Sequence, residues 1–195
     1  MTVIAKTGQW KLAQAILQST PDDLTKATKQ ALYQEGLHFV RAIKAIIHRG
    51  PTPPLALGKR REGPGRGGSK PLNASGDLLA SVTAEPQGAS DSVFVGVPRT
   101  AQGHGGQVVR LAETHEFGKT IVQEMTPKMR KFLFGVLFRD SPRKAGKGTR
   151  GLLVIHIPAR PFIRPAFEAE SPKSEDRVFR RLAHVLNGRI GTLGA

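Results

Sequence analysis

The clearest hydrophobic pattern in the chain predicts one long amphipathic helix near the N-terminus. Thr20-Pro21-Asp22-Asp23 has the residues of a helix start, with Thr20 as N-cap, a proline at the first helical position and an acid three residues after the cap. The apolar positions that follow recur at helical spacing, and Gly50-Pro51 ends the run. We therefore expect a helix of about 28 residues, roughly 42 Å long at 1.5 Å per residue, preceded by a shorter helix over residues 10–18.

Shorter patterns follow after a long loop. Helical spacing predicts short helices over residues 72–82, 108–117 and 126–137. Alternation over Ser92–Val97 predicts a strand, and the apolar run Leu152–Ile157 predicts a buried strand. This order of elements predicts an α+β fold, in which the long N-terminal helix packs on a small, mostly antiparallel sheet with additional short helices and long basic loops.

Ser171-Pro172 is a further helix start and predicts the last helix of the chain. Its apolar residues Val178, Leu182 and Val185 are spaced to face the core, so we place Arg177, Arg180 and Arg181 on its exposed face.

The length of 195 residues predicts a single domain over residues 1–195. We divide it into a helical part (1–49), a basic loop rich in glycine and proline (50–73), an α+β core (74–170) and a C-terminal helix (171–188). The core contains a second basic loop over residues 141–151.

Charge adds a class of partner to this picture. The chain has 30 Lys and Arg residues against 15 Asp and Glu, which gives a net charge of +15 and favours polyanionic or acidic surroundings. The two loops concentrate this excess, and glycine-spaced cations of this kind contact phosphates without reading bases. A solvated loop that only aids solubility is the alternative. The candidate contact residues for a DNA channel or an acidic partner are Lys59, Arg60, Arg61, Arg66, Lys70, Arg143, Lys144, Lys147 and Arg150.

Candidate chemistry does not change this reading. The chain has no cysteine, and two matches to G-x-G-x-x-G, at 63–68 and 146–151, lack the strand before and the helix after that a phosphate loop requires. His115-Glu116 begins a zinc-helix motif, but Lys119 occupies the position of its second histidine. We therefore expect no enzyme, no cofactor and no metal site. The apolar stretches are too short to span a bilayer, so we also expect no membrane association.

Three segments in order carry a family resemblance: Leu72–Val82, His115-Glu116-Phe117-Gly118 and Ile157-Pro158-Ala159-Arg160-Pro161-Phe162. With the strand at Val93–Val97 between them, they resemble the bacteriophage virion morphogenesis and tail-completion proteins over residues 70–168. The resemblance implies a non-enzymatic structural protein of the phage neck or tail, acting in tail completion, tail termination or head–tail joining. It implies a homo-oligomer, which we expect to be a hexameric ring around the DNA channel.

The resemblance also implies partners and a location. The partners would be other neck, connector and tail tube proteins, with contact to genome DNA in the channel left open. The location would be the virion, after synthesis in the host bacterial cytoplasm. A sequence-independent nucleic-acid-binding protein is the alternative function that the charge supports, and a nuclease comes third.

We interpret the motif residues as scaffold or interface positions. Pro158 and Pro161 remove two backbone donors, so the chain should leave the sheet there. Gly118 fits a helix end that needs a left-handed residue, and Arg160 is a candidate partner for a carboxylate within or between subunits. The full set is Gly76, Leu78, His115, Phe117, Gly118, Pro158, Arg160, Pro161 and Phe162.

Overall fold

The computed structural model describes residues 13–14, 16–17, 19–53, 72, 75–88, 91–132 and 151–193. Its elements in chain order are α2 (Pro21–Arg49), α3 (Asp77–Ser81), β1 (Thr83–Gln87), β2 (Ser92–Gly96), β3 (Gln102–Gly103), β4 (Gly106–Gln107), α4 (Val108–Phe117), β5 (Lys119–Glu124), α5 (Pro127–Phe132), β6 (Leu152–Ile157), α6 (Ile163–Glu170), a 3₁₀ turn (Ser171–Lys173) and α7 (Ser174–Leu193). The α+β fold predicted from the sequence is confirmed.

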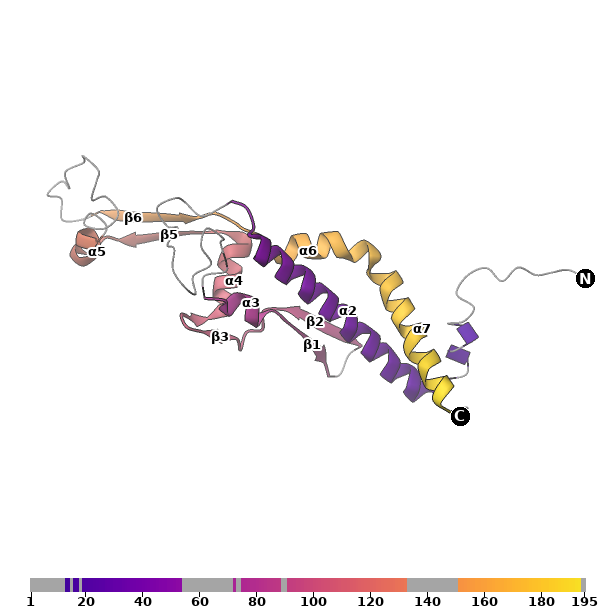
Figure 1. Ribbon diagram of the computed structural model, residues 1–195. Coiled ribbons are helices and arrows are strands. Elements are labelled where there is room, and N and C mark those ends of the chain that lie inside the picture. Colours follow the sequence, from indigo (N-terminus) through magenta and orange to yellow (C-terminus); the bar gives the residue numbers. More distant parts are fainter. Residues whose placement is uncertain are drawn as a thin grey trace, which may run out of the picture.

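Helix α2 forms the spine of the molecule, as the hydrophobic pattern predicts. The Asp23 amide donates to Thr20 Oγ1 at 3.2 Å, which satisfies one of the free donors at the helix start. Gly50 ends the helix at φ 84°, and its amide donates back to the carbonyls of Ile46 and Ile47. Figure 1 shows α7 along the N-terminal half of α2 and the β1–β2 pair along its other side.

The described strands form three separate antiparallel pairs, β1–β2, β3–β4 and β5–β6, where the sequence predicted one small sheet. The β1–β2 pair lies directly against α2 at Gly36. A Cβ atom at Gly36 would come within 2.8 Å of Val93 Cγ1 and 3.1 Å of Ala84 Cβ. The absence of a side chain at position 36 therefore allows the helix backbone to approach the strands.

The main core fills the space between the C-terminal half of α2 and the elements that follow it. Phe162 and Ile43 are fully buried there, and Phe39 stacks on Phe167 with ring centroids 4.6 Å apart. The buried members of this core are Val40, Ile43, Ile47, Leu78, Val82, Ala84, Val97, Val108, Ala112, Phe162 and Ala166. A smaller cluster joins Ala27 and Ala31 of α2 to Leu182 and Leu186 of α7.

A buried ionic cluster sits between α2 and α7. Glu35 is 4% exposed, and its carboxylate accepts from Arg177 Nη2 at 2.7 Å and from Arg181 Nη1. Arg177 also reaches the Glu170 carboxylate at 3.1 Å, and Glu170 in turn contacts His38 Nε2 at 2.8 Å. The prediction that Arg177 and Arg181 lie on an exposed face is therefore wrong, because the buried carboxylate of Glu35 draws both arginines inward. Arg180 is exposed.

Other boundaries differ from the pattern. The helix predicted over residues 72–82 is limited to Asp77–Ser81, because Gly76 adopts a left-handed conformation at φ 81° immediately before it. The strand Leu152–Ile157 exists, but it is not buried: Leu152 and Val154 are 67% and 60% exposed. It pairs with β5 in a ribbon of two strands, so no second layer of described residues covers it. The rest of the 126–137 helix lies outside the described residues, as does most of the predicted helix over 10–18.

The cluster around Glu35 makes a prediction about stability. Burial alone raises the pKa of Glu35, but hydrogen bonds from Arg177 and Arg181 outweigh it and hold this pKa below the ordinary glutamate value. The stabilisation is therefore complete above the ordinary pKa and is lost as the pH falls through the lowered one. We expect Glu35→Gln to reduce the free energy of unfolding by about 3 kcal/mol at pH 7.

Urea unfolding between pH 3 and pH 7 measures both effects. The wild-type protein should lose stability toward pH 3 more steeply than Glu35→Gln does. Arg180→Ala removes an exposed arginine of the same helix and should change the free energy by less than about 0.5 kcal/mol. Equal losses in the two variants would contradict a special role for the buried carboxylate.

Candidate assembly surface

The most unusual surface of the molecule is the ribbon formed by β5 and β6, which we call the arm (residues 119–124 and 152–157). Its register runs from Lys119 opposite Ile157 to Glu124 opposite Leu152. Figure 1 shows both strands running outward from α4 and the C-terminal end of α2, with α5 at the far end. Among the described elements, β5 and β6 have extensive contacts only with each other.

The arm presents apolar side chains on both faces. Side chains alternate along a strand, so Val122 and its partner Val154 share one face with Leu152. These three are 59%, 60% and 67% exposed, and we call their side the outer face. The opposite face holds Ile121, Leu153, Ile155 and Ile157, which are half-buried. A ribbon of two strands is marginally stable in water by itself, so these exposed aliphatic side chains make the arm a candidate contact surface.

The base of the arm is fixed by a close backbone contact between two of the motif segments. Gly118 lies between α4 and β5 at φ 74°, and a Cβ atom there would come within 2.9 Å of the Ala159 nitrogen and 3.0 Å of the Ile157 carbonyl oxygen. The Arg160 amide donates to the His115 carbonyl at 2.6 Å. Gly118 has the positive φ expected at this helix end, although its ψ of 163° lies outside the left-handed helical region, and the missing side chain also allows the close packing.

Glu116 joins α4 to the start of α6. Its Oε2 atom accepts from the backbone amides of Phe162 and Ile163 at 2.9 and 3.0 Å, and its Oε1 atom accepts from the backbone amide of Arg164 at 2.9 Å. These are free donors at a helix N-terminus, where a negative charge is favourable. One carboxylate therefore fixes the direction in which α6 leaves the arm.

Arg160 and His115 complete this junction. Arg160 is 6% exposed, and its Nε donates to the Pro53 carbonyl at 2.7 Å, which ties the junction to the segment after α2. Burial and the nearby charge of Arg160 lower the pKa of His115. The imidazole is thus kept neutral beside a buried arginine, which avoids repulsion between two cations.

The structure brings most of the motif residues together at this junction. His115, Phe117 and Gly118 end α4, and the Pro158–Phe162 segment leads from β6 to α6, as the two prolines predict. Gly76 and Leu78 lie instead on α3, where Leu78 is buried in the main core and Gly76 provides the left-handed turn. The nine basic candidates at positions 59–70 and 143–150 lie outside the described residues.

Two hollows flank α6. The first, which we call the cleft, has a volume of about 310 Å³ and lies between α4 and α6. Its walls are mainly aliphatic and aromatic, and Glu113, Glu116 and Arg164 stand among them; the apolar wall residues are Val97, Val109, Ala112, Phe117, Ile163 and Phe167. Phe117 is 68% exposed and directly precedes Gly118, so the apolar surface continues from the cleft to the base of the arm.

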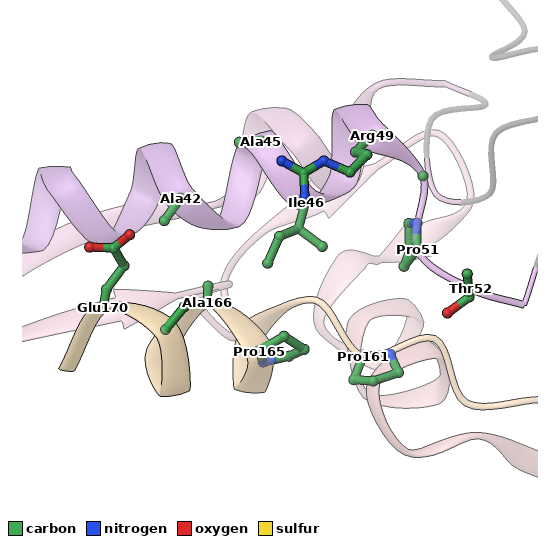
Figure 2. Close-up of a pocket in the computed structure, with 12 residues that line it drawn as sticks. Ala42, Ala45, Ile46, Arg49, Pro51, Thr52, Pro161, Pro165, Ala166 and Glu170 are labelled. Carbon is green, nitrogen blue, oxygen red and sulfur yellow. The ribbon is translucent and has the colours of Figure 1, made fainter. Parts of the chain in front are cut away.

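The second hollow, of about 610 Å³, lies between the C-terminal part of α2 and α6. Figure 2 shows Ile46 of α2 pointing toward Pro165 and Ala166 of α6, with Glu170 toward one end and Thr52 toward the other. Its lining is mostly alanine and proline, with Arg49 and Glu170 as its charged residues. Both hollows are open surface features, and neither collects paired nucleophiles, acids and bases.

Within the described part of the chain, no cluster of three or more His, Asp or Glu side chains could hold a metal ion. None of the described helices is both long and apolar enough to cross a membrane. Comparison of the chain with protein-family models, with curated proteins and with solved structures finds no match.

The sequence did not indicate strand β5 or the exposure of the outer face. In Lys119–Glu124 only Ile121 and Val122 are apolar, and they are adjacent, so no alternation marks a strand. In the sequence, Glu116 stands out only in the incomplete zinc motif and in the segment that carries the family resemblance, and neither indicates a cap. Its role in capping a helix 46 residues later in the chain leaves no local pattern.

Glu116 offers a direct test of the junction. We expect Glu116→Gln to lower the free energy of unfolding by about 1 kcal/mol, because the amide replaces a charge and one of the accepting oxygens at the start of α6. Urea unfolding measures this loss. Glu113→Gln removes an exposed acid one turn earlier on the same helix and should stay within about 0.5 kcal/mol of wild type. A loss as large in Glu113→Gln would contradict the capping role.

Proposed function

We propose that this protein is a structural component of a bacteriophage neck or tail, in tail completion or head–tail joining, and that it assembles as a ring around the DNA path. The observation that carries the proposal is the arm: a ribbon with apolar side chains on both faces that is rigidly joined to the body by Gly118, Glu116 and Arg160. Such an element supports a role in assembly, because its apolar side chains stay exposed to water in the single subunit.

The resemblance of the motif segments to virion morphogenesis and tail-completion proteins supports the same proposal. In the fold, the second and third of these segments meet at the base of the arm, and the first lies on α3 in the core behind it. Motif segments that meet at the base of a projecting ribbon suit a structural subunit, which acts through its shape and its contacts and has no need of a reactive site. Head-to-tail contacts between such subunits generate closed rings when the rotation closes.

The first test is the oligomeric state. We expect native mass spectrometry and negative-stain imaging of the purified protein, alone or with tail tubes of the phage that encodes it, to show a ring, with six copies as the expected number. The apolar contact should persist when salt is raised. A chain that stays monomeric and binds neither tail nor neck proteins would contradict the proposal.

A nucleic-acid-binding protein is the second candidate, and the charge is the observation that favours it. Of the 30 Lys and Arg residues, 12 lie outside the described residues together with 2 of the 15 Asp and Glu, so these parts carry +10 of the net +15. The described residues have 18 cations and 13 anions, a net charge of only +5. The excess is thus concentrated in segments outside the scaffold.

Duplex DNA binding measured against salt separates the two candidates. For the neck role we expect weak binding by the free subunit, with assembly unchanged when Arg60, Arg61, Lys144 and Lys147 are replaced by alanine. A dedicated binder would bind tightly, lose affinity steeply with salt, and lose it again in this variant. The control removes four cations from described helices, at Lys26, Lys29, Arg41 and Arg180. Tight binding that only the loop variant abolishes would favour the second candidate.

A further inference from the structure

We propose that the outer face of the arm packs into the cleft between α4 and α6 of a neighbouring copy of this chain. This inference rests on the proposed ring and names the contact that holds it together. The arm supplies Val122, Leu152 and Val154, which are among the most exposed large apolar side chains of the described residues. The cleft supplies a concave wall of Val97, Val109, Ala112, Ile163 and Phe167, with the exposed ring of Phe117 at its edge.

A subunit cannot fill its own cleft with its own arm. Phe117 lines the cleft, and the extended chain leaves from Gly118 beside it. At about 3.3 Å per residue, Val122 lies roughly 13 Å beyond Gly118, and Leu152, which pairs with Glu124, lies roughly 20 Å beyond it. The junction at Ala159 and Arg160 holds the base of the ribbon, so it cannot fold back. An arm that occupies the cleft must therefore come from another molecule.

The same chain carries both an exposed apolar arm and an apolar cleft, which favours a second copy as the partner. In a head-to-tail arrangement each subunit would receive one arm and offer its own, so every copy uses both surfaces once. The charges agree: by register Glu124 lies on the outer face with Val122, and Arg164 stands in the wall of the cleft, where it can pair with that carboxylate. The hollow shown in Figure 2 is a poorer receptor, because polar atoms make up a larger share of its exposed lining than they do in the cleft.

The absence of cysteine from the chain makes a clean cross-linking test possible. The double variant Glu113→Cys/Val154→Cys places one thiol at the rim of the cleft and one on the arm, both at exposed positions. A short bis-maleimide should produce a ladder of covalent multimers from this variant on a denaturing gel. Each single variant should give no species larger than a dimer. The control Lys26→Cys/Val154→Cys, with its second thiol on the N-terminal half of α2, should give no ladder.

A second variant tests the same contact without a cross-linking reagent. Val122→Glu/Val154→Glu places two charges on the outer face, and we expect it to abolish the oligomer. Because both side chains are exposed, its melting temperature as a monomer should stay within a few degrees of Leu17→Glu, which changes an apolar residue that is 87% exposed elsewhere. Leu17→Glu should assemble normally.

The outcomes separate this inference from the proposed function. A ring without the ladder, or a ring that survives Val122→Glu/Val154→Glu, overturns the arm contact and leaves the neck role standing. A protein that forms no oligomer and binds no tail or neck protein overturns both. A multimer-free sample in which cross-linking joins the two thiols within one chain would show that the chain covers its own arm, and it would overturn the contact between copies.

Discussion

The packing of α2 on two sides at once is the constraint on which the rest of the molecule depends. Glu35 and Gly36 are neighbours in sequence and lie about 100° apart around the helix. Glu35 holds Arg177 and Arg181 of α7, while the missing side chain of Gly36 lets β1 and β2 reach the backbone. The charge of Glu35 thus positions α7 on one side of this helical turn, and the missing side chain of Gly36 positions β1 and β2 on the other. The α4, α6 and arm junction is built against the next turns of the same helix.

The direction of the arm is set by interactions at its base. Glu116 closes three amides at the start of α6, and Gly118 allows β6 to pass within contact distance of the end of α4. These interactions fix the direction of the arm but do not cover it. The ribbon therefore gains rigidity from its base and lacks a hydrophobic partner along its length among the residues that the structure describes, which is the physical basis for the proposed role in assembly.

The sequence predicted the elements whose signals are local. The Thr20 cap, the apolar period of α2, the end of α4 at Gly118 and the exit from β6 at Pro158 all follow from short stretches of residues. The interactions between elements were not predictable. Arg177 pairs with Glu35, which is 142 residues away in the sequence, and no pattern in the helix of Arg177 indicates that its side chain is buried. The burial of β6 was overestimated for a related reason. The composition of an apolar run does not show whether other residues of the same chain cover it.

The distribution of charge bears on what kind of contact could join copies in the proposed ring. Each subunit carries +15, so two copies repel each other at long range, and a close apolar contact is one interaction that can outweigh that repulsion. The described scaffold carries only +5, which lowers the cost of bringing arm and cleft together. The basic segments would then be held at high local density around the ring. An anion enclosed by the ring, whether duplex DNA or an acidic neighbour, would neutralise that density and stabilise the assembly as well as occupy it.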